Sequence, residues 1–210
     1  MPASRRRAVG EIAAVIATGA VYLVFENVLH LKLPFLVACL AGWGTYGTLR
    51  MARDPQTRRD WGFRLDTLAP SAIACGVFYL VVAGAILAWR VWKGWIPIPP
   101  STALLFVVYP VWGLCQQFVV QALIAGNLDR LGAPRAAIIP IAAILFGLAH
   151  APDLSLMALC AGAGLVWTSI FLRFPNLLPI SLTHAWLGSF VYLMILERNP
   201  WAEMQLPGLS

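Results

Sequence analysis

Charged residues are scarce in this sequence. Only 11% of the 210 residues carry a charge, and the longest polar stretch runs from residue 50 to residue 66. A soluble enzyme or a sizeable domain outside the membrane needs a more polar surface, so this composition excludes both. Hydrophobic residues make up 60% of the chain, and the mean hydropathy is +0.77. The sequence therefore predicts a polytopic integral membrane protein.

Cysteine pairs with the spacing of a metal or redox site are also lacking. The four cysteines stand singly in separate apolar segments, so we interpret them as small buried residues. Lysine and arginine outnumber aspartate and glutamate by 15 to 9, but they lie at the ends of apolar segments and form no stripe. This distribution indicates membrane orientation and argues against nucleic acid as a partner.

Apolar runs bounded by charges, proline and glycine predict the fold class. A helix needs roughly 20 residues to cross the lipid bilayer, so we expect an all-α membrane helix bundle of about seven transmembrane helices. We predict that residues 1–210 form a single integral membrane domain. The fifth run is the shortest and contains Pro140. The predicted spans are residues 9–25, 33–49, 69–89, 103–126, 136–150, 155–172 and 177–196.

The distribution of basic residues predicts the orientation of the chain. With the N-terminus in the cytoplasm, most arginines fall on the cytoplasmic side, as the positive-inside rule requires. Seven spans then put the C-terminus outside, and we predict a multi-pass protein of the bacterial inner membrane. The arginines on the cytoplasmic side would be Arg5, Arg6, Arg7, Arg50, Arg53, Arg58, Arg59, Arg64, Arg130, Arg135 and Arg173.

The middle of the predicted spans lacks carboxylates and holds amides and histidines instead. Gln116, Gln117 and Gln121 lie in the fourth span, His150 ends the fifth, and His184 lies in the seventh. Charged side chains cost about 2.5–3.5 kcal/mol at the bilayer centre, so polar residues there are functional candidates. Residues four apart share a helix face. These side chains would either line a common cavity or hydrogen-bond helix to helix.

Three motifs follow one another along these spans. They are W-G-L-C-Q-Q-F-V-V-Q-A (residues 112–122), F-G-L-A-H (residues 146–150) and T-H-A-W-L-G (residues 183–188). Their order resembles the CAAX protease and bacteriocin-processing family of intramembrane proteases. That family carries Glu-Glu-x-x-x-Arg, Phe-x-x-x-His and His-x-x-x-Asn on successive helices. Together with D-W-G-F-R (residues 60–64), the resemblance covers about residues 60–190.

The resemblance assigns roles to particular residues. It implies catalytic roles for Gln116 and Gln117, which stand at the family's two glutamates, and for His150 and His184. Phe146 keeps the family's phenylalanine and is implied to help form the binding site.

Two further positions depart from the family pattern. Gln121 stands at the arginine and is implied to bind, and Gly188 stands at the asparagine. Because a neutral amide cannot take a proton from water, His150 becomes the candidate base, oriented by Asp153 three residues later. Glutamine also ligates metals poorly, so we predict no cofactor, and a divalent metal finds little support.

Three functions stay open at this point. The first is an intramembrane endopeptidase that hydrolyses a peptide bond of a membrane-associated protein or peptide. The second is a catalytically inactive relative that binds a peptide or a lipid-linked partner within the membrane. The third, a small transporter or channel component, lacks paired intramembrane charges and a sequence repeat.

The depth of the candidate residues makes the site hypothesis testable. At 1.5 Å per residue, His150 lies about 22 Å deep if its helix begins at Arg135, and about 15 Å deep if it begins at Pro140. Gln116 and His184 lie at about 10–15 Å. A shared site therefore predicts that the fifth span begins late, at Pro140.

Overall fold

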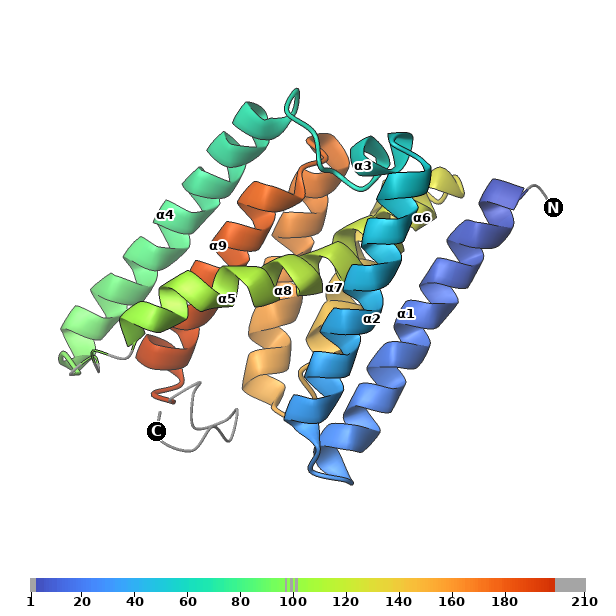
Figure 1. Ribbon diagram of the computed structural model, residues 1–210. Helices are drawn as coiled ribbons and strands as arrows, with labels where there is room; N and C mark the ends of the chain where they lie inside the picture. The colour runs from blue at the N-terminus through green and yellow to red at the C-terminus, as the bar shows by residue number, and fades with distance from the viewer. Residues whose placement is uncertain (1–2, 97, 99, 101, 199–210) are drawn as a thin grey trace.

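The computed structural model describes residues 3–96, 98, 100 and 102–198 (Figure 1). Within these residues every regular element is a helix, which confirms the predicted all-α fold. The helices are α1 (Ala3–Asn27), α2 (Lys32–Arg53), α3 (Gln56–Asp60), α4 (Leu68–Lys93), α5 (Thr102–Gln117), η1 (Phe118–Ala125), α6 (Gly126–Arg130), α7 (Arg135–Leu148), α8 (Leu154–Arg173), α9 (Leu177–Phe190) and η2 (Val191–Ile195).

Helix length and composition support the multi-pass architecture. In the described part of the chain, five helical segments are long and apolar enough to cross a membrane, while α7 is apolar but only 14 residues long. α2 has 22 residues and is less apolar. The predicted count of seven is therefore approximate. The five segments are Ser4–Asn27, Leu68–Lys93, Thr102–Arg130, Leu154–Arg173 and Leu177–Ile195.

The predicted late start of the fifth span is wrong. α7 begins at Arg135 and continues through Pro140 to Leu148. The turn after α6 explains this: Gly132 has a φ of +84°, and Pro134 is extended with ψ 138°. The carbonyl of Pro134 then accepts from Ala137 and Ile138 at 2.8 and 3.1 Å, so the first helical turn forms before Pro140.

Helix α5 crosses the bundle obliquely and passes close to α9 (Figure 1). The two helices approach closely at Gly113, where an added Cβ atom would lie 2.9 Å from the Ser181 carbonyl oxygen and 3.2 Å from the Ala185 Cβ atom. Small residues let membrane helices approach through their backbones. This contact brings the end of α5, which carries the glutamines, against the helix that carries His184.

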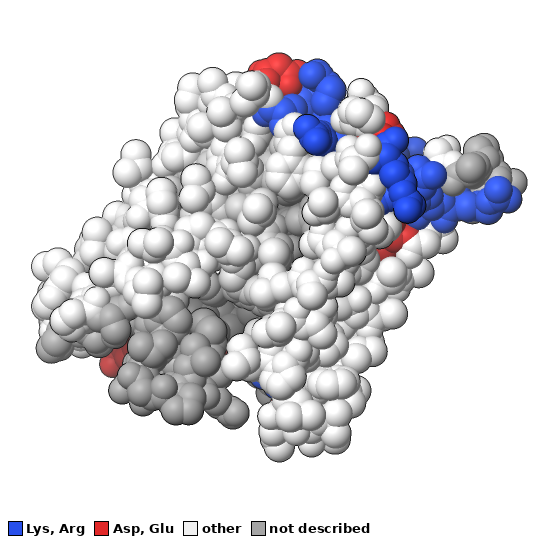
Figure 2. Space-filling model, viewed as in Figure 1, with Lys and Arg blue, Asp and Glu red and all other residues white. Residues whose placement is uncertain are grey.

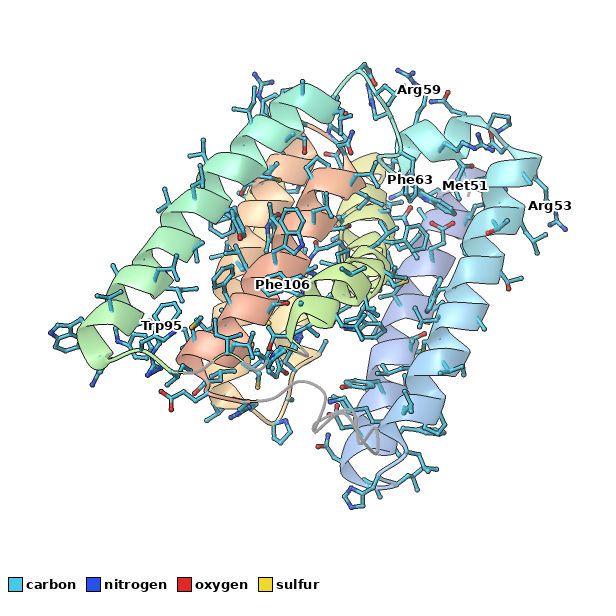
Figure 3. All side chains as sticks on the ribbon, turned by 60° about the vertical axis from the view of Figure 1, so that its left-hand side comes forward. Met51, Arg53, Arg59, Phe63, Trp95 and Phe106 are labelled. Carbon is cyan, nitrogen blue, oxygen red and sulfur yellow. The ribbon has the colours of Figure 1, made fainter. Side chains whose placement is uncertain are left out.

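The two ends of the bundle differ in charge. In Figure 2, lysine and arginine gather at the end formed by the start of α1 and the loop between α2 and α4. Figure 3 shows Arg53 and Arg59 at this end, and Trp95 at the opposite end, where α4 finishes. Basic residues therefore gather at one end of the bundle, and the side of the membrane that this end faces stays a prediction.

Candidate active site

The glutamines lie where the regular α-helix changes to a π-helix. Gln117 is the last residue of α5, and Gln121 lies in η1, the π-helical segment Phe118–Ala125. Both side chains are fully buried, and Nε2 of Gln121 donates to Oε1 of Gln117 at 3.1 Å. The predicted shared face of these two residues is confirmed. π-helical turns are rare and are frequent at functional sites.

Gln117 links the two glutamines to helix α9. Its Nε2 donates to Nδ1 of His184 at 3.1 Å, and His184 is 4% exposed. Because Nδ1 accepts a hydrogen bond, the ring proton lies on Nε2. Gln121, Gln117 and His184 thus form a buried, uncharged chain of hydrogen bonds between α5, η1 and α9.

Aromatic rings surround His184. The ring centroid of His184 lies 5.1 Å from that of Trp167, 5.3 Å from that of Phe146 and 6.4 Å from that of Tyr109. Nε1 of Trp167 donates to Oγ1 of Thr183 at 3.2 Å, which fixes this ring beside the histidine. The amide–histidine chain therefore lies in an apolar enclosure, where its hydrogen bonds are stronger than in water.

His150 lies in the turn after α7 and is half-buried. Its Nδ1 donates to the Phe146 carbonyl oxygen at 2.8 Å, because a carbonyl can only accept. The Phe146 ring stands nearly perpendicular to both histidine rings, at 88° to His150 and 85° to His184, and its centroid lies 5.1 Å from that of His150. Phe146 therefore brings the two histidines into one cluster without a direct contact between them.

A count of residues gives the depth of a side chain only in a helix that runs parallel to the membrane normal. α5 instead runs obliquely (Figure 1), so counting residues from a helix end does not give its depth. Gln117, Phe146 and His184 come together although α7 starts at Arg135.

Asp153 does not orient His150 as expected. In the described structure its carboxylate caps α8 by accepting from the Leu156 backbone N–H at 3.0 Å, and it pairs with Arg198. These two partners hold the pKa of the Asp153 carboxyl below its usual range. The turn that follows α7 puts the Phe146 carbonyl against Nδ1 of His150, so the backbone takes the role predicted for Asp153.

Gln116 and Gly188 differ from the other predicted positions. The Gln116 side-chain oxygen is buried and has no hydrogen-bond partner among the described residues. At Gly188, which stands at the family's asparagine, an added Cβ atom would lie 3.1 Å from Cε1 of Tyr109. Tyr109 therefore occupies space that a longer side chain at Gly188 would need. Sequence reasoning missed Tyr109 and Trp167, which lie outside the motifs, and assigned no role to Thr183, the first residue of the third motif.

Sequence reasoning also missed a buried carboxylate. Glu11 on α1 is 8% exposed; it accepts from the Tyr46 hydroxyl on α2 and, at 2.8 Å, from Nδ2 of Asn127 on α6. Arg130 donates to Oδ1 of Asn127 at 2.7 Å. These partners are distant in sequence, so no local pattern could reveal them. The cluster ties α1 to the rest of the bundle at the basic end.

A metal site has no support in the geometry. The described residues contain no group of three or more histidine, cysteine, aspartate or glutamate side chains that could hold an ion. The amide groups beside His184 are poor metal ligands.

Helical architecture and an amide–histidine cluster define a multi-pass membrane protein with a buried polar site. Residues 98–190 match the family model described as type II CAAX prenyl endopeptidase Rce1-like. The match includes all three motifs and runs from before α5 to the end of α9, so the resemblance to CAAX proteases is confirmed over this part of the chain. No curated protein and no solved structure matches the chain.

Proposed function

We propose that this protein is an intramembrane endopeptidase that hydrolyses a peptide bond of a membrane-associated protein or peptide, with His150 as the base. One observation carries the proposal. Nδ1 of His150 donates to the Phe146 carbonyl, so Nε2 holds the lone pair that can accept a proton. The family match over residues 98–190 supplies the reaction class.

The reaction uses the cluster as follows. Water adds to the carbonyl carbon of the scissile bond and gives a proton to Nε2 of His150, which passes it to the departing amine. The Nε2 proton of His184, held in place by Gln117, stabilises the developing oxyanion. The unpaired oxygen of Gln116 holds the attacking water or a peptide N–H. Gln121 and Phe146 position these groups.

A second function is favoured by the charge of the site. Amides replace both family glutamates and the arginine, and His184 is enclosed at 4% exposure with Gln117 on its Nδ1. Such a neutral cluster suits a catalytically inactive relative that binds a peptide or a lipid-linked partner without cleaving it.

Comparative analysis of protein termini distinguishes the two functions. Membrane and secreted fractions are compared from cells with the wild-type protein, a deletion, His150→Asn and His30→Asn. His30 is an exposed histidine with a φ of 55°, a conformation that asparagine tolerates, so its replacement is a matched control. We expect the same termini to disappear in the deletion and in His150→Asn, and to persist in His30→Asn.

Two other results are informative. If His150→Asn leaves those termini in place while the deletion removes them, His150 is not the base. If no terminus changes and a partner protein loses abundance only in the deletion, the binding function is correct.

A further inference from the structure

An open groove lies between α1 and α2, outside the residues that match the protease family. Its volume is about 760 Å³. Small residues line it, with Gly10, Ala14 and Ala17 on α1 facing Ala38 and Gly42 on α2. The small side chains on these facing positions do not fill the space between α1 and α2, so an apolar groove stays open along the bundle surface.

The groove begins at the basic end of the molecule. Arg7 lines its mouth, is exposed, and makes no ion pair or hydrogen bond with the described residues. Basic side chains gather over the same end of the molecule (Figure 2). Glu11 also lines the mouth, but both of its oxygens are occupied by Tyr46 and Asn127. The free charge at this position is therefore positive and is available to an anion.

The dimensions of the groove match a lipid chain. From Arg7 to Val21 the helix rises about 21 Å at 1.5 Å per residue. Half of the hydrocarbon core measures about 15 Å, so an acyl chain that starts at Arg7 would end near Ala17.

We propose that this groove binds an anionic phospholipid, with its phosphate on Arg7 and one acyl chain between α1 and α2. The positive charge of Arg7 selects the anionic headgroup, and the acyl chain packs against the small residues of the two helices. This site is separate from the amide–histidine cluster and does not depend on the proposed peptidase function.

Native mass spectrometry of the full chain tests the proposal. The detergent-solubilised protein is titrated with phosphatidylglycerol and with phosphatidylcholine of the same acyl composition. We expect tighter binding of phosphatidylglycerol, and about a fivefold loss of its affinity in Arg7→Gln, because one arginine near a membrane surface contributes about that much attraction to anionic lipid. Arg6→Gln removes the same charge from a residue that does not line the groove and should retain binding.

A second pair of variants tests the position of the acyl chain. Ala17→Phe fills the groove and should weaken binding, whereas Ala13→Phe adds the same ring at an exposed position outside it and should not. Equal binding of the two lipids, or equal losses in Arg7→Gln and Arg6→Gln, would overturn the proposal. So would a dimer of the wild type that Ala17→Phe dissociates, because the groove would then hold a second copy of the chain.

Discussion

His150 and His184 hold the ring proton on different nitrogens. His150 uses Nδ1 as a donor to the Phe146 carbonyl, and His184 uses Nδ1 as an acceptor from Gln117. One histidine therefore has a basic Nε2 and the other has a protonated Nε2. Two side chains of the same type acquire different chemistry from a single hydrogen bond each.

The two adjacent glutamines should behave differently when replaced by leucine. Gln117→Leu leaves Nδ1 of His184 and Nε2 of Gln121 without a partner in a buried site, which should lower stability by about 1–3 kcal/mol. Gln116→Leu removes an oxygen that has no partner, so the melting temperature should stay near the wild-type value. Thermal unfolding in detergent measures both.

The Gln116→Leu variant also tests the peptidase proposal. Gln116→Leu should lose processing at unchanged stability if its oxygen holds water or substrate. Full processing by this variant would remove Gln116 from the site.

At the scale of elements, close helix contacts determine which residues meet. α5 and α9 approach at Gly113, and α7 and α8 approach at Gly147, where an added Cβ atom would lie 2.8 Å from the Met157 carbonyl oxygen. The π-helical segment η1 then follows Gln117 directly. Gln117 is held against His184 by backbone packing that side-chain patterns do not encode.

Gly113→Ala should therefore separate α5 from α9. The new methyl group would lie 2.9 Å from a backbone oxygen that cannot move away freely, and overpacking of this kind costs about 1–3 kcal/mol. The matched control is Gly76→Ala in α4, where nothing lies within 4 Å and alanine favours the helix. A lower melting temperature for Gly113→Ala alone is expected. Equal values for the two variants would contradict the close contact.

At the scale of the whole molecule, α1 is held by a buried polar cluster at the basic end. Glu11 accepts from Tyr46 of α2 and Asn127 of α6, and Arg130 continues the network through Asn127. This arrangement joins the two helices that precede the matched residues to the bundle that carries the candidate site. It also forms one end of the groove between α1 and α2.

Glu11→Ala should loosen α1 because Tyr46 and Asn127 lose their acceptor in a buried site. We expect a lower melting temperature and faster proteolysis in the loop between α1 and α2. Glu26→Ala removes the partly exposed pair with Lys32 and should have a small effect, since such pairs contribute little. Identical behaviour of the two variants would show that the cluster does not anchor α1.

Composition and periodicity suffice to predict the membrane class, the helical segments and the polar residues within them. Hydrophobic runs report burial in lipid directly, and the spans 69–89 and 155–172 lie within α4 and α8. The pairing of Gln117 with Gln121 also followed from helix periodicity.

The contacts of these residues with other helices depend on how the helices pack. The bond of Gln117 to His184 joins positions 67 residues apart, and the contacts of Phe146 with both histidines depend on how α7 packs against its neighbours. The start of α7 at Arg135 and the capping role of Asp153 depend on turn geometry. Spacing along a chain reports which residues share a helix face, whereas the relative tilt of two helices is set by the packing of both.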